Sequence, residues 1–173
     1  MARLKKVNGK KKGNKFELDI AKAIAATINE PYGTRVRRTP GSGSLLCRAD
    51  LWIHHTVRHK FPWFLELKKR ENIRLEHLFK PKNYLVGWYK DSKEKLQIDP
   101  EYDPLFTPTA LLFAKNNMMP FILMSAKDFV DMELASTYKG FKILFEDEGD
   151  SYIVIDWEKF LQLHLVTLDK AVS

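Results

Sequence analysis

The sequence predicts an α/β fold in which a central mixed β-sheet is flanked by helices. Two observations predict this class: short runs with strand-like patterning are interleaved with segments whose apolar residues recur at helical spacing, and an acidic turn near the C-terminus separates two strands of a hairpin. The expected order is α-β-β-β-α-β-β-α-β-β-α. The 173 residues are enough for a sizeable core, and we expect residues 14–173 to form one domain.

The first predicted helix spans residues 14–29 and begins at Asn14, a favourable N-cap. Its apolar stripe consists of Phe16, Ile20, Ala23, Ile24, Thr27 and Ile28. Glu17 lies on or beside this buried stripe. It is either a first-turn acid favoured by the helix dipole or part of a functional site, and the helix pattern alone leaves both interpretations open.

Two short strands and a loop follow this helix. A strand over residues 34–39 carries three arginines, and the Gly/Ser-rich loop 40–44 comes after it. Small residues and hydroxyls in such a loop allow a phosphate to approach the backbone, although an ordinary turn has the same composition. The next strand, Asp50–His54, is expected to pair with a strand over residues 62–68 across a turn near residues 57–60.

The strand that ends at Lys68 has two different faces, because side chains alternate along a strand. One face carries Phe61, Trp63, Leu65 and Leu67, and the other carries Pro62, Phe64, Glu66 and Lys68. A half-buried carboxylate is costly unless it is paired or bound to a metal ion. The face with Glu66 and Lys68 therefore indicates a functional site.

The second half of the chain is predicted from apolar runs and turn signals. Residues 73–90 are expected to be mostly helical, and residues 91–108, which are polar and contain three prolines, to form a loop insertion. The remaining elements are strands at Thr109–Ala114 and Pro120–Ser125, a helix at Ala126–Leu134 capped by Ser125, a hairpin of Phe141–Phe145 and Tyr152–Ile155, and a helix at Asp156–Val166.

The net charge of +7 is concentrated at the N-terminus. Residues 1–15 contain seven basic residues and no acid, whereas basic and acidic residues balance over the rest of the chain. We expect residues 1–13 to form a flexible basic arm that binds a polyanion such as DNA through its phosphates. A solvated tail that only aids solubility fits the charge alone nearly as well.

The composition excludes several classes of protein. The single cysteine, Cys47, excludes an internal disulfide and a cysteine-rich zinc site. No apolar run has the length of a membrane-spanning helix, and the basic N-terminus lacks the apolar segment of a signal peptide. We therefore expect no membrane partner and an intracellular protein, in the cytoplasm or nucleoid or, for a phage protein, in the host cytoplasm.

Three histidines, His54, His55 and His59, raise the alternative of a histidine-metal nuclease. His54 and His55 would alternate across a strand and so cannot face one ion, and no helical histidine pair supports them. We expect these residues to lie on the surface or within a strand.

Hydrolysis of a phosphodiester needs a nucleophilic water, neutralised phosphate charge and a stabilised leaving oxygen, and a divalent cation held by carboxylates supplies most of this. Asp50 and Glu66 on neighbouring strands can point to one ion, with the Leu67 carbonyl as a further ligand. Lys68 reaches the same spot, where its ammonium can orient the attacking water and stabilise charge. Glu17 can complete this metal site or bind a second ion.

Several of these residues occur in the order of a known family: Lys12-Gly13, Glu17, Arg38-Thr39-Pro40-Gly41-Ser42-Gly43, Asp50 and Leu65-Glu66-Leu67-Lys68. Over residues 12–70 the chain resembles the PD-(D/E)XK nucleases and, within them, the archaeal-type Holliday junction resolvases. The resemblance implies a restriction-endonuclease-like core and a homodimeric endonuclease that uses Mg²⁺, with Mn²⁺ as a substitute, to cut branched DNA such as a four-way junction. Ala49 stands where the family usually has proline.

The same resemblance implies three metal-binding acids and one catalytic lysine, namely Glu17, Asp50, Glu66 and Lys68. It also implies that Arg38 and Ser42 contact DNA near the scissile phosphate. The full set of expected DNA contacts is Lys10, Lys11, Lys12, Arg35, Arg37, Arg38, Ser42, Ser44, Lys69 and Arg70.

A symmetric homodimer would supply two active sites for two strand cuts. Candidates for its interface are Trp157, Phe160 and Leu161, although most of these are expected in the core. Two alternatives to a junction-cutting enzyme stay open: a restriction-type, repair or replication endonuclease on the same core, and a non-catalytic DNA-binding protein.

Overall fold

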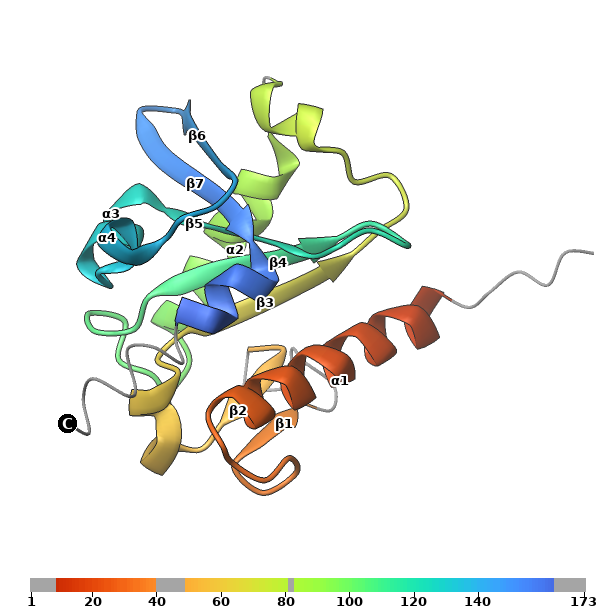
Figure 1. Cartoon of the computed structure of the whole chain (residues 1–173), viewed down its shortest axis with the longest axis vertical. Helices are drawn as coiled ribbons and strands as arrows, with labels where there is room; N and C mark the ends of the chain where they lie inside the picture. The colour runs from red at the N-terminus through yellow and green to blue at the C-terminus, as the bar shows by residue number, and fades with distance from the viewer. Residues whose placement is uncertain (1–8, 40–48, 81–82, 164–173) are drawn as a thin grey trace, which may run out of the picture.

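The computed structural model describes residues 9–39, 49–80 and 83–163, and its centre is a mixed five-stranded β-sheet (Figure 1). The strand order is β3-β4-β5-β7-β6, with β3 and β4 parallel and the other neighbours antiparallel. The strands are β3 (Phe64–Lys69), β4 (Thr109–Ala114), β5 (Phe121–Ser125), β6 (Lys142–Asp147) and β7 (Asp150–Asp156). This architecture confirms the predicted α/β class, and it places β3 at an edge of the sheet.

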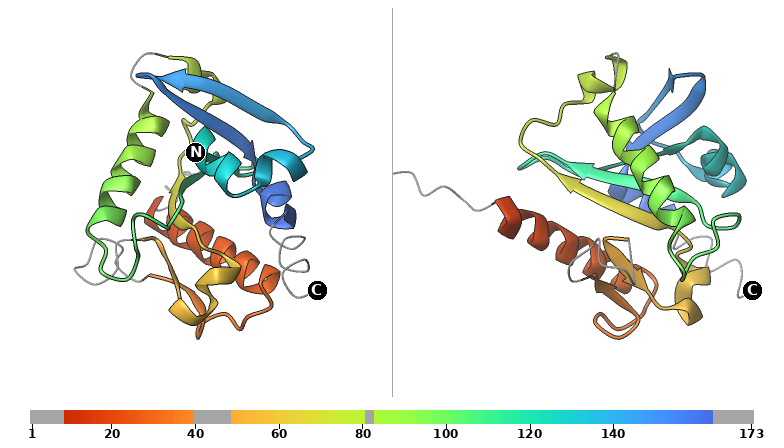
Figure 2. Two further views of the ribbon diagram at one scale, coloured as in Figure 1. Left: turned by 90° about the vertical axis from the view of Figure 1, so that its left-hand side faces the viewer. Right: turned by 180° about the vertical axis from the view of Figure 1, so that it is seen from behind.

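Helices cover both faces of this sheet (Figure 2). One face packs against α1 (Gly9–Thr27), α3 (Ala126–Asp131), α4 (Leu134–Thr137) and the helical residues 157–163. The other face packs against α2 (Tyr84–Gln97) and the 3₁₀ helix η2 (Leu75–Phe79). Leu65 and Leu67 of β3 join the α1 cluster, while Phe64 packs with Leu96 of α2, which confirms the predicted alternation. None of the helices that the structure describes is long and apolar enough to cross a membrane.

Strands β1 (Val36–Arg38) and β2 (Leu51–Ile53) form a separate antiparallel ribbon. The predicted pairing of Asp50–His54 with residues 62–68 is wrong, because β2 pairs with β1. The chain between β2 and β3 forms the 3₁₀ helix η1 (His55–Lys60) instead of a tight turn, so the two strands are not joined as a hairpin.

Helix α1 begins at Gly9, five residues before the predicted N-cap Asn14. Residues 9–13 of the predicted flexible arm are therefore helical, and the good helix propensity of the lysines accounts for this extension. The side-chain oxygen of Asn14 accepts a hydrogen bond from the Arg38 guanidinium at 2.9 Å. Residues 1–8 of the predicted arm lie outside the described residues.

Helix α2 continues to Gln97, so the first part of the predicted loop insertion 91–108 is helical. Its buried stripe keeps helical spacing up to the last turn and consists of Leu85, Val86, Tyr89, Ser92 and Leu96. The prolines that suggested a loop begin only at Pro100. The loop that follows α2 is held against β2, since Glu101 accepts a hydrogen bond from the Trp52 indole at 3.0 Å.

The C-terminal half of the sheet follows the prediction closely. Strand β4 has the predicted bounds, and Ser125 caps α3 by accepting a hydrogen bond from the Asp128 N–H at 2.9 Å. The β6–β7 hairpin turns at Glu148 and Gly149, whose φ angles of 52° and 87° are both positive, as a type I′ turn requires. The candidates for a dimer interface are buried in the core, as expected for most of them: Trp157, Phe160 and Leu161.

Candidate active site

The open edge of β3 carries the first part of the candidate site. The Phe64 N–H donates to the Pro108 carbonyl beside β4 at 2.9 Å, so the even-numbered residues of β3 direct their backbone groups toward that strand. Leu67 therefore directs its N–H and its carbonyl to the open edge. There its N–H donates to the buried Asp50 carboxylate at 2.7 Å. Asp50 thus meets β3 as predicted, through its side chain and not through strand pairing.

Glu66 projects from β3 toward α2 and is almost completely buried, with 2% of the residue exposed. Lys68 donates a hydrogen bond to one carboxylate oxygen, Oε1, and Lys95 of α2 donates to the other, Oε2, at 2.6 Å. A buried carboxylate is costly without opposite charge, and here the two ammonium groups supply it. The structure therefore brings the predicted Glu66 and Lys68 together and adds Lys95 to them.

Lys95 is a candidate that sequence reasoning missed, because the residue was assigned to the loop insertion. A usable signal was nevertheless present in the sequence. Leu85, Tyr89, Ser92 and Leu96 continue one helical stripe, and a helix drawn through Leu96 would have placed Lys95 beside the core-facing side chains.

Glu17 has a different basic partner. Its Oε2 accepts a hydrogen bond from Nε of Arg38, and its side chain is 16% exposed. In the described part of the chain, no group of three or more His, Cys, Asp or Glu side chains is placed to hold a metal ion. The predicted meeting of Glu17 with Asp50 and Glu66 therefore does not occur. The reason is topological: α1 covers the Leu65/Leu67 face of β3, whereas Glu66 projects to the opposite face, toward α2.

The three predicted DNA-binding arginines of the β1 region do not form one patch. Arg38 turns toward α1, where it binds Glu17 and Asn14. Arg37 stacks on the Trp52 ring at 4.3 Å, and Arg35 donates a hydrogen bond to Thr56 at 2.8 Å. Alternation along the strand accounts for the separation of Arg38 from Arg37, because neighbouring side chains point to opposite faces.

Two of the predicted DNA-binding lysines, unlike the arginines, line the same pocket. Lys12 of α1 and Lys69 of β3 line one pocket of about 340 Å³, together with Lys15, Asp19, Asn116 and Asn117. Glu71 links its two sides, accepting hydrogen bonds from Lys12 at 2.9 Å and from Asn116 at 2.8 Å. The hydrogen bond and charge of Lys12 lower the pKa of Glu71. Lys15, Asn116 and Asn117 were not predicted.

The other predicted DNA contacts are more scattered. Lys11 is exposed on α1, and Arg70 lies over the Trp88 ring at 5.8 Å. Ser42, Ser44 and the side chain of Lys10 lie outside the described residues.

Comparison with known proteins gives one match. Residues 8–169 match a family model described as "Phage putative PDDEXK endonuclease". The chain belongs to this family. Its membership confirms the resemblance to the PD-(D/E)XK superfamily and makes the protein a nuclease, for which DNA is the implied substrate. No curated protein and no solved structure matches the chain.

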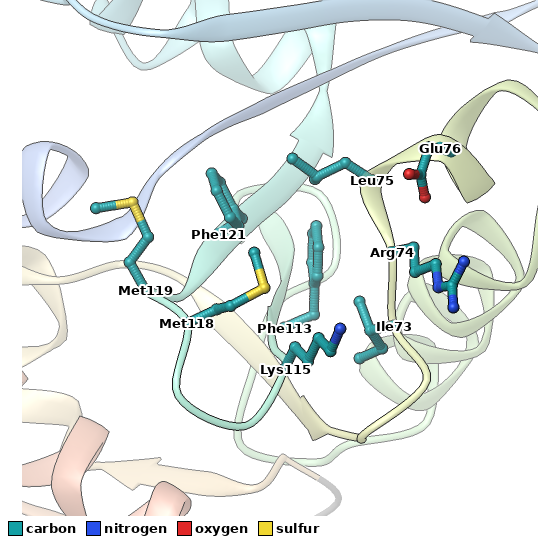
Figure 3. Close-up of a pocket in the computed structure, with 9 residues that line it drawn as sticks. All are labelled: Ile73, Arg74, Leu75, Glu76, Phe113, Lys115, Met118, Met119 and Phe121. Atoms are coloured by element: carbon teal, nitrogen blue, oxygen red, sulfur yellow. The ribbon is translucent and has the colours of Figure 1, made fainter.

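This PD-(D/E)XK nuclease also contains a larger cavity of about 420 Å³ (Figure 3), and neither Asp50 nor Glu66 lines it. Its lining is mainly apolar: Ile73, Leu75, Phe113, Met118, Met119 and Phe121, with Arg74, Glu76 and Lys115. Glu76 is the one carboxylate among these lining residues, so the cavity does not offer the oxygen ligands of a metal-dependent nuclease.

His54, one of the three histidines weighed as metal ligands, has a structural role. His54 caps η1, because its Nδ1 accepts a hydrogen bond from the Thr56 N–H at 3.3 Å. Desolvation lowers the pKa of His54, and the neighbouring His55, Arg35 and Arg58 lower it further. The prediction that His54 and His55 alternate across a strand is wrong, since they stand at the start of a 3₁₀ helix with ring centroids 4.2 Å apart.

Proposed function

We propose that this nuclease is a metal-dependent DNA endonuclease whose active centre lies at the open edge of β3. One observation carries the proposal: Asp50 binds the backbone N–H of Leu67 at that edge, and the neighbouring residue, Glu66, is a buried carboxylate that holds the Lys68 ammonium. The donor set fits a hard divalent cation such as Mg²⁺ or Mn²⁺, because it offers two carboxylates and the Leu67 carbonyl. Glu66 already binds two cationic groups in the structure.

The metal ion would supply an activated water and neutralise phosphate charge when bound. The chain's own residues have separate roles. The Leu67 N–H fixes the orientation of the Asp50 carboxylate. Glu66 holds the Lys68 ammonium at the same edge, where it can orient the attacking water and stabilise developing charge. Glu17 would act through Arg38, directing its guanidinium to DNA; a second ion at Glu17 is the alternative.

Substitution at the β3 edge tests this assignment. Lys68→Ala and Asp50→Asn should each lower Mg²⁺-dependent cleavage by roughly a thousandfold or more while DNA binding persists. Lys90→Ala is the matched control, because Lys90 forms a similar 2.6 Å pair with Glu148 on the exposed surface. Cleavage by the Lys68 and Asp50 variants at the rate of the control would refute the site.

We propose branched DNA, in particular a four-way junction, as the substrate. Support comes from the resemblance of residues 12–70 to archaeal-type resolvases and from the pocket that Lys12, Lys15 and Lys69 form beside β3, which suits a phosphate backbone. The test compares cleavage of a four-way junction with that of linear duplex, flap and single strand. Preferential cleavage of the junction is expected; equal cleavage of all four would favour a restriction-type, repair or replication endonuclease.

A homodimer is the proposed assembly, since two symmetric cuts need two sites. Exposed apolar side chains at the cavity of Figure 3 would meet a second copy: Met118 and Met119, which line it, and Phe141, whose ring contacts the lining residue Phe121. Light scattering of the wild-type protein should give the dimer mass, and Met118→Asp with Phe141→Asp should give the monomer mass. Leu105→Asp, on an exposed loop residue outside this surface, should remain dimeric. A monomeric wild-type protein would refute the assembly.

A further inference from the structure

We propose that Lys95 occupies Oε2 of Glu66 before metal binding and that a divalent cation displaces it from this oxygen. The inference rests on the proposed metal-dependent function of the β3 edge. It adds α2 to the site, because the last turn of α2 would then set how tightly the nuclease takes up metal.

The two lysines that hold Glu66 are anchored differently. Lys68 stands two residues from Glu66 on the same strand face, and its side chain is 25% exposed. Lys95 comes from the last turn of α2, and its side chain is 34% exposed. Lys95 is therefore the partner with more access to solvent, and its ammonium can leave Glu66 while the carbon stem stays against the protein. The C-terminal end of α2 favours a positive charge with or without Glu66.

The four charged side chains that the structure describes on these contacts have formal charges that balance before metal binds. Asp50 and Glu66 contribute two negative charges, and Lys68 and Lys95 contribute two positive charges. A divalent cation added to this set would leave two excess positive charges in a largely buried region, which is unfavourable. Release of Lys95 removes one of them, and the phosphate of the bound DNA offsets the other. Exchange of one cation for another at Oε2 thus keeps the site close to neutral.

A simpler role for Lys95 would be to hold Glu66 in the orientation that binds metal. The two roles predict opposite results. If Lys95 competes with the metal ion, its removal tightens metal binding; if Lys95 only orients Glu66, its removal weakens metal binding or leaves it unchanged.

The test measures Mn²⁺ binding without DNA, from the electron paramagnetic resonance signal of the free ion. Lys95→Met should bind Mn²⁺ roughly fivefold or more tightly than the wild-type protein, the usual scale of coupling between sites. Lys95→Arg, which keeps the charge, should stay near the wild-type affinity. Lys90→Met is the control, since Lys90 lies on the same helix as Lys95 but pairs with Glu148 of the β6–β7 turn. Unchanged or weaker binding by Lys95→Met would overturn the proposal.

Thermal unfolding gives a second readout. Without metal, Lys95→Met should melt below the wild-type protein, because Glu66 loses one of its two cations. Mn²⁺ should raise the melting temperature of the variant more than that of the wild type. The gap between the two melting temperatures should therefore narrow as the ion is added. A gap that stays constant would count against displacement. If Lys95→Met does not fold, Lys95→Gln, which keeps a hydrogen-bond donor without the charge, takes its place in both measurements.

Glu66→Gln separates this inference from the function on which it rests. The variant should lose Mn²⁺ binding. If it binds Mn²⁺ as the wild type does, the proposed metal site itself is wrong. If it loses binding while Lys95→Met shows no tightening, the metal site stands and the displacement of Lys95 is refuted.

Discussion

Glu66 and Glu17 are both carboxylates held by basic side chains, yet their surroundings differ in a way that bears on function. Glu66 is held by two ammonium groups and is almost fully buried, whereas Glu17 is held by the guanidinium of Arg38 and is partly exposed. An ammonium is a compact, strongly hydrated point charge, while a guanidinium is a rigid fork that binds several acceptors at once. The partners of Glu66 are therefore exchangeable, and the partner of Glu17 is fixed.

The fork of Arg38 also explains what Glu17 does for the fold. Nε of Arg38 donates to Glu17 and Nη2 donates to Asn14, so one side chain of β1 binds two residues of α1. This contact ties the β1–β2 ribbon to the first helix. The ribbon in turn presents Asp50 to β3, because Asp50 directly precedes β2. In the proposed function, Glu17 would thus influence the active centre without contacting the metal ion.

Replacing Glu66 and Glu17 separately by glutamine should give the largest difference in the rate of DNA cleavage. Glu66→Gln should lower cleavage by roughly a thousandfold or more, because it removes a metal ligand and the partner of Lys68. Glu17→Gln should cost only about tenfold, seen mainly as weaker DNA binding, since a mispositioned Arg38 loses a phosphate contact. Single-turnover cleavage and DNA affinity, measured for each variant, check this. Equal losses of cleavage would show that Glu17 is a metal ligand after all.

The next test replaces the guanidinium of Arg38 by the ammonium of a lysine. Arg38→Lys should lower the free energy of unfolding by about 1 kcal/mol, because a lysine cannot bind Glu17 and Asn14 together as the guanidinium does. Urea unfolding measures this change. The control is Arg37→Lys, whose residue stacks on Trp52 from the other face of the same strand and should change stability less. A larger loss in the control would remove the special role assigned to Arg38.

A third carboxylate, Glu71, extends the comparison to an exposed pair. Its contact with Lys12 joins two exposed side chains and contributes little stability. Glu71→Gln should free Lys12 for phosphate, raising DNA affinity and increasing the slope of log affinity against log salt by up to about one unit. Glu148→Gln, at the β6–β7 turn where Glu148 pairs with Lys90, controls for the general loss of a negative charge. If both variants gain the same DNA affinity, Lys12 does not bind the DNA phosphates.

The parts of the fold that the sequence predicted are those with a local pattern. Strand β4 is a continuous apolar run, the β6–β7 hairpin has a turn of acidic residues and glycine, and the alternation in β3 separates Leu65 and Leu67 from Glu66. Each pattern reflects burial on one or both faces of a sheet. The residues Glu66 and Lys68 could be selected for the same reason, since a charged pair on a half-buried strand is costly without a function.

The missed features depend on contacts between distant segments. Asp50 meets Leu67 through a side chain at an open strand edge, and no local pattern predicts which edge stays open. Glu17 was grouped with Glu66 because both adjoin buried stripes, but only the packing of α1 and α2 decides which face each stripe meets. Lys95 was not predicted as a site residue, because the prolines of residues 91–108 led to the assignment of a loop. The helical stripe of α2 in fact continues to Leu96.

The smallest expected effect concerns His54, a basic side chain at the N-terminal end of η1. Desolvation lowers its pKa below the ordinary 6.5, so the unfolded chain takes up a proton more readily than the folded protein. Stability linked to His54 is therefore present above about pH 6.5 and is lost as the pH falls below that value. His54→Asn keeps an acceptor for the Thr56 N–H but cannot titrate, so its melting temperature should fall less between pH 7.5 and 5.5 than that of the wild type. His59→Asn, on an exposed residue of the same 3₁₀ helix, is the matched control. If His54→Asn and His59→Asn follow the same pH dependence, the proton uptake belongs to another group.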